Sequence, residues 1–190
     1  MIPVIRMVKV PAPLDHETVQ TLMSLAPAEK QIRIRRQRVR QNADNMLVGA
    51  ALARYLLWQE FRIPYTAKIA YGPHGKPYLA DYPDIHFNIS HSGQYVVCAV
   101  CDRPVGIDIQ EMVPYRPEVA ASVCNLTEMA QLNVSAERER EFAQIWEKKE
   151  AFVKLTGDGI AGELKNLRFP EHVHFAQFEY GVYVIAVAYL

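Results

Sequence analysis

The sequence lacks the features that would assign it to several specialised classes of protein. Charge of neither sign is in excess, because 21 Lys and Arg are balanced by 21 Asp and Glu among 190 residues, and this argues against nucleic-acid binding through bulk positive potential. No apolar run is long enough to span a bilayer, and residues 1–10 lack the long apolar core of a signal peptide. Only three cysteines are present, without the spacing of a disulfide framework. We therefore expect a reduced, cytoplasmic protein without a membrane segment.

The pattern of apolar residues predicts an α+β fold. β-prone runs occur in both halves, at residues 1–10, 68–71, 85–89, 95–100, 105–109, 167–169, 173–178 and 182–188. Helical periodicity predicts helices at residues 15–25 and 27–59, the second with a possible break near Asn42. A third long helix ends near Gly157. Each half therefore combines helices with antiparallel strands, and the join falls near residues 102–110.

The predicted helix that ends near Gly157 carries a charged face beside its apolar stripe. Glu147, Glu150 and Lys154 recur at i, i+3 and i+7, so they share one side of the helix. Such a face can be a solvated series of ion pairs. It can also form one wall of a site that holds a cation and a phosphate.

A second charged segment, residues 30–40, is unusually basic and places Arg33, Arg36 and Arg40 on one side of its predicted helix. Taken alone, this strip is compatible with a solvated face, with a site for a phosphate or an acidic protein, or with nucleic-acid binding. The lack of interleaved aromatic residues weakens the last alternative. The glycine- and proline-rich loop at residues 72–77 could bring backbone N–H groups close to a ligand, although most loops of this composition are only turns.

The predicted strand at residues 105–109 presents a carboxylate on a buried surface. Asp108 and Gln110 lie two residues apart and face the same side, whereas Glu111 faces the other. An unpaired carboxylate is costly to desolvate, and a cation would offset that cost. Asp108, Glu150 and the amide oxygen of Gln110 form an all-oxygen set that suits Mg²⁺. The alternatives are a local ion pair at Asp108 and a purely structural His91 at the tip of its hairpin. Taken together, the metal-binding carboxylates, the polar tip of the hairpin and the basic residues indicate a metal-chelated pyrophosphate as ligand.

Four short motifs follow one another along the chain. They are Gly75-Lys76-Pro77, residues 87–93 (FNISHSG), residues 106–109 (GIDI), and the pattern Trp146-x-x-Lys149-Glu150-x-Phe152-x-Lys154-x-x-Gly157-x-Gly159. In this combination the sequence resembles the 4′-phosphopantetheinyl transferase superfamily, and within it the Sfp type of holo-carrier-protein synthase. The resemblance covers roughly residues 20–160.

The resemblance implies two similar lobes related by a pseudo-twofold axis, each an antiparallel sheet packed with helices, with coenzyme A in the cleft between them. We expect residues 1–103 to form the N-terminal lobe and residues 104–190 the C-terminal lobe. The implied reaction moves the 4′-phosphopantetheine arm of coenzyme A to a serine of an acyl or peptidyl carrier protein and releases 3′,5′-adenosine bisphosphate. The implied cofactor is Mg²⁺, and the expected assembly is a monomer.

The resemblance also implies roles for individual residues. Asp108 and Glu150 would be metal ligands, and Glu150 would in addition accept the serine proton. Lys154 would stabilise the pyrophosphate leaving group, and His91 would act with it. The implied contacts with coenzyme A are those of Arg33 and Arg36 with the 3′-phosphate, of Gly75, Lys76 and Pro77 around the adenine, and of Ser90, His91, Lys149 and Lys154 with the phosphates.

One position departs from the pattern, because Gln110 stands where many members carry a glutamate as a third acidic metal ligand. A neutral side chain would hold the metal more weakly unless a water or Glu111 compensates. Glu111 would need a bulge in the strand to do so. This departure leaves open a non-catalytic coenzyme A-binding protein.

Two further alternatives belong to other functional classes. A serine hydrolase could use Ser90 or Ser92 with His91 and Asp108, but adjacent side chains on a hairpin project apart and no nucleophile-elbow pattern is present. A nucleic-acid-binding protein could use residues 30–40, and a steep salt dependence of binding would support it.

Overall fold

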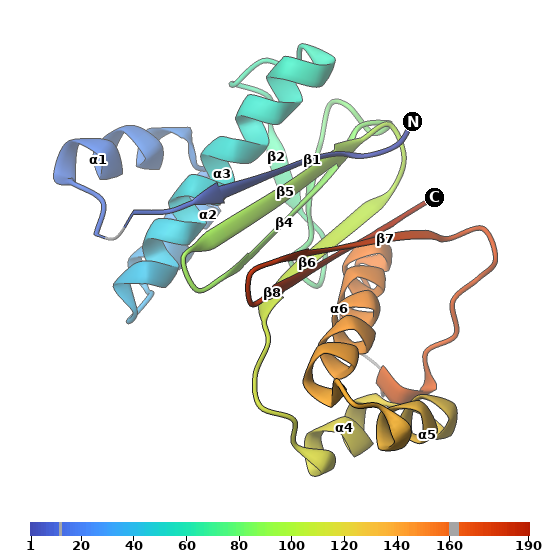
Figure 1. The fold of residues 1–190 in the computed structure, drawn as a ribbon. Coiled ribbons are helices and arrows are strands. Elements are labelled where there is room, and N and C mark those ends of the chain that lie inside the picture. The colour runs from blue at the N-terminus through green and yellow to red at the C-terminus, as the bar shows by residue number, and fades with distance from the viewer. Residues whose placement is uncertain (12, 160–163) are drawn as a thin grey trace.

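The computed structural model describes residues 1–11, 13–159 and 164–190. In the first half the elements are β1 (Val4–Lys9), α1 (His16–Leu25), α2 (Ala28–Arg35), α3 (Arg40–Phe61), β2 (Ile69–Tyr71), β3 (Pro77–Leu79), β4 (His86–Ser92) and β5 (Tyr95–Cys101) (Figure 1). In the second half they are β6 (Val105–Glu111), α4 (Pro117–Val123), α5 (Leu126–Val134), α6 (Arg138–Thr156), a 3₁₀ turn (Leu164–Asn166), β7 (His174–Tyr180) and β8 (Tyr183–Tyr189).

The two halves have the same topology. In each half a first strand is followed by helices and then by a hairpin, and the first strand pairs antiparallel with the last. This gives the strand orders β1-β5-β4 and β6-β8-β7. The short strands β2 and β3 pair with each other as a separate hairpin. The predicted α+β class with antiparallel sheets in both halves is confirmed.

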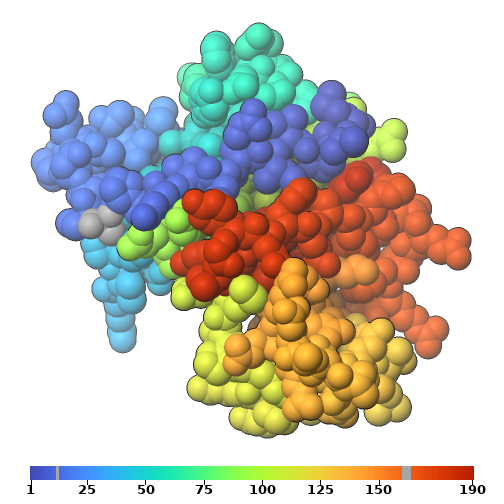
Figure 2. All heavy atoms as spheres, viewed as in Figure 1, coloured from blue at the N-terminus to red at the C-terminus, as the bar shows by residue number. Residues whose placement is uncertain are grey.

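One long helix covers each of the two larger sheets. The apolar face of α3 packs on the first sheet, where Leu56, Phe87 and Val100 belong to one buried cluster. The apolar face of α6 packs on the second, where Ala151, Phe152 and Ala186 are buried together. In the space-filling view the red C-terminal strands lie between the blue N-terminal segment and the orange α6 (Figure 2). None of the helices in the described part of the chain is both long and apolar enough to cross a membrane.

The halves meet along β4 and β6, which lie side by side and are joined through side chains. Asn88 Oδ1 accepts a hydrogen bond from the Ile107 amide at 2.9 Å, and Ser92 Oγ accepts one from the Glu111 amide at 3.2 Å. Polar side chains of β4 thus satisfy these backbone groups of β6, while a buried apolar cluster that includes Val97 and Ala99 of β5 and Ile107 of β6 also joins the two halves. The boundary between the halves is where the charged residues of the motifs come together.

The helix α6 approaches β6 as closely as backbones allow. A Cβ atom at Gly106 would overlap the carbonyl oxygen of Ala151 and the amide nitrogen of Leu155. Only glycine fits there, and the contact fixes which face of α6 is turned toward β6. The helix ends at Gly157, which has the left-handed φ of 74° that favours glycine at this position.

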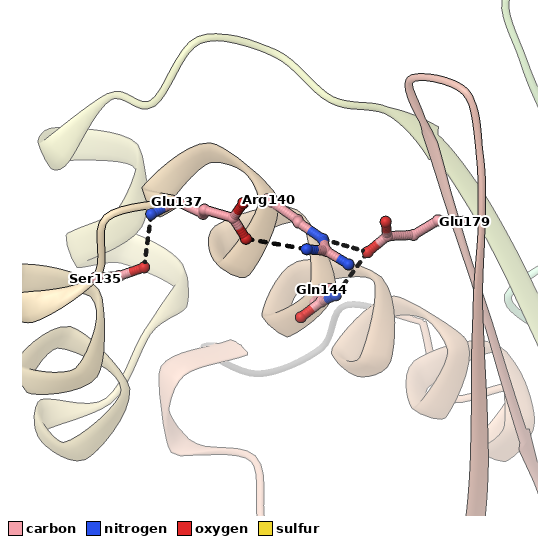
Figure 3. A network of polar contacts seen from close by, with 5 residues as sticks. All are labelled: Ser135, Glu137, Arg140, Gln144 and Glu179. Atoms are coloured by element: carbon pink, nitrogen blue, oxygen red, sulfur yellow. Dashed lines mark hydrogen bonds and ion pairs between the residues drawn. The ribbon is translucent and has the colours of Figure 1, made fainter.

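At its other end, α6 is attached to β7 by exposed polar contacts. Arg140 donates to Glu137 at 2.9 Å and to Glu179 at 2.7 Å, and Gln144 also donates to Glu179 at 2.7 Å (Figure 3). The Ser135 hydroxyl accepts from the Glu137 amide at 3.1 Å. Exposed pairs of this kind contribute little stability, so the buried contacts of α6 dominate its placement.

Three local predictions need correction. The segment at residues 27–59 is two helices, and the break lies at residues 36–39 rather than near Asn42. Residues 167–169 form no strand; Phe169 instead packs edge-on against Phe152 and Phe175, so its apolar character reflects core packing. The β4–β5 turn is shorter than the predicted tip, because residues 90–92 belong to β4.

Candidate active site

The side chains of Asp108, Ser90 and Lys154 meet where the two halves of the fold come together. They belong to β6, β4 and the last turn of α6, respectively. The Lys154 ammonium donates to Asp108 Oδ1 at 2.5 Å and to Ser90 Oγ at 2.8 Å, and the Ser90 hydroxyl donates to the same Asp108 oxygen. Asp108 is only 9% exposed. Charge-assisted hydrogen bonds at such a site fix the position of both charged groups.

Two further carboxylates of α6, those of Glu147 and Glu150, lie near Asp108. Burial, and then the charge of Asp108, raises the pKa of Glu150, while Lys154 acts in the opposite direction. Glu147 is 0% exposed, and neither of its carboxylate oxygens has a hydrogen-bond partner in the part of the chain that the structure describes. Burial, followed by Asp108, raises the pKa of Glu147 to about 10. Three acidic groups thus share one ammonium, and a divalent cation would relieve their repulsion.

The donor set at this centre fits a hard cation such as Mg²⁺, because all the donors are carboxylate oxygens. Among residues 1–11, 13–159 and 164–190, no three His, Cys, Asp or Glu side chains stand close enough together to be an assembled metal site. In this conformation Lys154 supplies the counter-charge of Asp108. Cation binding would therefore involve side-chain movement, with water or substrate oxygens as further ligands, as is usual for Mg²⁺.

A cavity of about 260 Å³, here called the first cavity, lies beside Lys154. The residues that line it include Lys30, Arg33, Tyr71, His74, Gly75, Lys76 and Pro77 from the first half of the chain and Val153, Lys154, Gly157 and Gly159 from the second. Both halves therefore contribute to one cavity, and its volume suits part of a drug-sized ligand.

The surroundings of the first cavity are cationic. Burial, followed by the charge of Arg33, lowers the pKa of Lys30. The Arg33 guanidinium lies over the Tyr71 ring at 5.2 Å from its centroid. Burial, followed by Lys30 and Lys154, lowers the pKa of His91, which is half-buried. A ligand that carries phosphate groups would relieve this repulsion between like charges.

The loop between β2 and β3 is fixed to the second half by Lys76. Its Nζ donates to the carbonyl oxygen of Val105 at 3.1 Å and to that of Leu155 at 2.7 Å, and burial lowers the pKa of Lys76 to about 8. Gly75 has φ of +82°, which favours glycine, and a Cβ there would stand 3.4 Å from the Arg33 guanidinium. The loop is therefore held against the cavity by its backbone and by Lys76.

A second cavity of about 470 Å³ opens between β6, α4 and α6. Gln110, Glu111, Phe142, Trp146 and Glu147 are among the residues that line it. The charged centre thus lies between two cavities, with Lys154 on the wall of the first and Glu147 on the wall of the second.

The two halves of the chain match two related protein families. Residues 12–103 match the family described as 4′-phosphopantetheinyl transferase, N-terminal, and residues 104–184 match the 4′-phosphopantetheinyl transferase superfamily. The 4′-phosphopantetheinyl transferase Sfp of Bacillus subtilis (strain 168) is 34% identical over 152 residues, which are 78% of this chain and 68% of that protein. This chain belongs to the 4′-phosphopantetheinyl transferase superfamily.

Further relatives agree with this assignment. The 4′-phosphopantetheinyl transferase psf-1 of Bacillus pumilus is 35% identical over 179 residues, covering 84% of this chain and 77% of that protein. These relatives support the predicted Sfp type and the transferase class. Among solved structures, the holo-[acyl-carrier-protein] synthase (AcpS) of Thermotoga maritima matches 45% of this chain and 61% of its own with a TM-score of 0.40 and 20% identity.

Lys149 of this transferase does not lie with the other motif residues. It is 1% exposed, and its Nζ donates to the Val123 carbonyl oxygen at 2.8 Å and to Glu128 Oε2 at 2.6 Å. These contacts hold α6 against α4 and α5, and Lys149 lines neither cavity. These contacts indicate a structural function for Lys149 in this conformation, and its expected contact with a coenzyme A phosphate stays a prediction.

We expect Lys149→Met to destabilise the transferase without weakening coenzyme A binding. The substitution keeps the apolar stem but leaves Glu128, which is partly buried, without its cation, and this costs about 2 to 3 kcal/mol. Chemical denaturation measures the stability, and calorimetric titration measures the dissociation constant. The neighbouring Lys148→Met is the control, because the Lys148 ammonium lies over the rings of Phe169 and Phe175, and losing these cation–π contacts costs about 0.5 to 1 kcal/mol. A large loss of coenzyme A affinity in Lys149→Met would instead support a contact between Lys149 and a coenzyme A phosphate.

Two other expected site residues, Arg36 and Gln110, are exposed rather than buried at the charged centre. Arg36 is exposed at the end of α2 and lines neither cavity, in contrast to Arg33. Gln110 is exposed on the second cavity. The pairing of β6 with β8 stays regular through Glu111, so the bulge that would turn Glu111 toward Asp108 is not present in β6.

The serine hydrolase alternative lacks the required geometry. Ser90 donates its hydroxyl hydrogen bond to Asp108 and accepts from Lys154, and within the described residues no hydrogen bond joins Ser90 to His91. A nucleophile needs a base within hydrogen-bonding reach. The arrangement therefore does not support acyl transfer by Ser90.

Two residues at the site were not predicted as site residues from the sequence. Lys30 was part of the basic segment, and Glu147 was recognised as sharing a helix face with Glu150 and Lys154. The spacing alone could not show that Glu147 would be buried against Asp108, since that depends on how α6 is turned on the sheet.

Proposed function

We propose that this enzyme transfers the 4′-phosphopantetheine arm of coenzyme A to a serine of an acyl or peptidyl carrier protein, with Mg²⁺ as cofactor and 3′,5′-adenosine bisphosphate as the released product. The observation that carries the proposal is the meeting of Asp108 and Lys154 beside a cavity with cationic walls. Phosphoryl transfer requires mainly positioning and charge neutralisation, with little covalent work by the protein.

The first cavity would bind the nucleotide part of coenzyme A. Arg33 and Lys30 are the cations for the 3′-phosphate, and Arg36, which is exposed at the end of α2, would contribute less. The backbone of Gly75, Lys76 and Pro77 would lie against the adenine. Ser90, His91 and Lys154 would then contact the pyrophosphate at the charged centre between the two cavities.

Asp108 and Glu150 would hold the metal, with the amide oxygen of Gln110 as a weaker neighbour. When bound, Mg²⁺ neutralises charge on the pyrophosphate oxygens and orients them for transfer. Asp108 is well placed for this because β6 carries it, 9% exposed, to the boundary between the halves. Glu150 would also accept the serine proton, since a positioned carboxylate can act as a general base.

In the proposed reaction the serine oxygen bonds to the phosphorus that carries the pantetheine arm, and the phosphorus–oxygen bond of the pyrophosphate breaks. The serine proton passes to Glu150, directly or through a water. The electron pair of the broken bond leaves with 3′,5′-adenosine bisphosphate, whose developing negative charge Lys154 stabilises. His91 would assist by orienting the phosphate.

Incubation with coenzyme A, Mg²⁺ and an apo carrier protein tests this function. We expect intact-mass measurement to show a gain of one phosphopantetheine group, and we expect no gain with a carrier whose acceptor serine is replaced by alanine or in the presence of a metal chelator. An acyl and a peptidyl carrier protein are tested in parallel, because the acceptor is the undetermined substrate. Binding of coenzyme A without any mass gain on either carrier would favour the non-catalytic alternative.

We also propose that residues 1–103 and 104–190 act as two lobes with the ligand between them, and that a single copy of the chain is sufficient for activity. The shared strand order of the two halves supports the first statement. Proportionality of the transfer rate to enzyme concentration over a wide dilution range, with a monomer in size-exclusion chromatography, would support the second.

A further inference from the structure

Glu147 is a buried ionisable group that the proposed reaction leaves unused. Its side chain is 0% exposed, and among residues 1–11, 13–159 and 164–190 no donor reaches either of its carboxylate oxygens. A carboxylate in this position is strongly unfavourable unless a proton or a cation reaches it. The side chain therefore needs a partner that the described protein residues do not supply.

The packing of α6 on β6 directs Glu147 at Asp108. Gly106 of β6 touches the backbone of α6 at Ala151 and Leu155. Two residues further along β6, about 6.6 Å away, is Asp108. Four residues back along α6, about 6 Å away, is Glu147. The two spacings match, so Glu147 and Asp108 lie near each other across the contact of α6 with β6, and the charge of Asp108 contributes to the raised pKa of Glu147.

Glu147 also lies near position 110, where a neutral side chain stands. Gln110 is two residues beyond Asp108 on the same face of β6, and Gln110 and Glu147 line the same second cavity. A carboxylate on α6 at this point can therefore serve the same cation as a carboxylate on β6 at position 110. The helix would supply the acidic group that the strand lacks.

We propose that Glu147 is the third acidic ligand of the divalent cation, together with Asp108 and Glu150, and that it replaces the acid that is missing at position 110. This inference rests on the proposed function, since that function brings the cation to Asp108. It explains the presence of an acid at a fully buried position without a partner among the described residues. The three carboxylates would have to converge on the cation, because in this conformation no three acidic side chains of the described residues form an assembled site. The opposing explanation is a neutral Glu147 that shares a proton with Asp108 and has only a structural function.

Cation binding, measured apart from transfer, distinguishes these explanations. Isothermal titration calorimetry with Mg²⁺, and electron paramagnetic resonance with Mn²⁺, are carried out in the presence of coenzyme A. We expect Glu147→Gln to weaken Mg²⁺ and Mn²⁺ binding by about tenfold or more, with the circular dichroism spectrum retained because the substitution keeps the shape. Glu139→Gln is the matched control, because Glu139 lines the same second cavity but is exposed, and we expect unchanged affinity.

A second substitution tests the relocation of the acid. We expect Glu147→Gln combined with Gln110→Glu to return cation affinity to within about threefold of the unmodified enzyme, because the double variant moves the carboxylate from α6 to β6 and keeps the total charge. Glu147→Asp, which retains the charge but shortens the side chain, covers the case in which Glu147→Gln does not fold, and we expect it to weaken cation binding.

The outcomes are separable from failure of the proposed function. Unchanged Mg²⁺ affinity in Glu147→Gln or in Glu147→Asp would overturn the inference and make Glu147 a neutral structural acid, while transfer to the carrier protein could still proceed. If Glu147→Gln weakens Mg²⁺ binding and the added Gln110→Glu does not restore it, the claim that Glu147 takes the place of an acid at position 110 would be overturned. If the unmodified enzyme with coenzyme A binds no Mg²⁺, both the inference and the proposed use of Mg²⁺ are overturned.

Discussion

Asp108→Asn is expected to reduce kcat/KM for transfer to the carrier protein by about a hundredfold or more. The carboxylate of Asp108 accepts hydrogen bonds from both Lys154 and Ser90, and it is the central candidate ligand for the cation. Asparagine keeps the shape of the side chain but removes the charge. Lys154 then loses its counter-ion, and the proposed cation site loses one of its acids.

Stability should change much less than activity in Asp108→Asn. The substitution removes an ion pair with Lys154, but it also removes the repulsion between Asp108 and the buried Glu147. The measurements are the rate of carrier modification by mass spectrometry and the midpoint of thermal unfolding. Asp102→Asn is the control, because Asp102 is exposed and forms its ion pair with the chain amino terminus. Activity of Asp108→Asn within a few-fold of the unmodified enzyme would remove Asp108 from the reaction centre.

Gly106→Ala is expected to destabilise the fold by about 3 kcal/mol or more. The added Cβ would overlap backbone atoms of α6 at Ala151 and Leu155, and backbone atoms cannot rotate away as the end of a flexible side chain can. The helix would have to move away from β6, which would open the core around Phe152. The same movement would separate Lys154 from Asp108, so transfer should fall as well.

Urea denaturation with the far-ultraviolet circular dichroism signal measures the effect of Gly106→Ala. Gly72→Ala is a suitable control, because a Cβ there would meet only the Lys76 carbonyl oxygen at 3.7 Å, an ordinary van der Waals distance, and its φ is not in the left-handed region. We expect the control to change the unfolding free energy by about 0.5 kcal/mol or less. A Gly106→Ala protein of normal stability would mean that α6 and β6 are not in backbone contact.

Local sequence patterns predicted most of the elements because their causes are local. The β-branched and apolar runs of β5, β6 and β8 are continuous, and the hairpin turns contain glycine with positive φ at Gly93 and Gly181. The end of α6 at Gly157 follows from the same conformational preference. Residues 167–169 were wrongly predicted as a strand, because an apolar run indicates burial but not how the backbone pairs.

The directions in which Lys149 and Glu150 point depend on how α6 is placed on the sheet. Lys149 and Glu150 are neighbours in one motif, yet successive helix residues point about 100° apart. The structure turns Glu150 toward Asp108 and Lys149 toward Val123 and Glu128. A motif does not carry that information, because it depends on how the helix is placed on the sheet.

The sequence by itself determined the α+β class, the approximate position of most strands and helices, and membership of the transferase superfamily through motifs that follow one another in order. Only the tertiary structure decided that Ser90, Asp108 and Lys154 share one set of hydrogen bonds, that Glu147 is buried without a partner among the described residues, and that Lys149 is bonded to Val123 and Glu128. The physical reason is that periodicity fixes which residues share a face of a helix or strand. Which face is buried against which neighbour depends on contacts between residues far apart in the chain, such as that of Gly106 with Ala151.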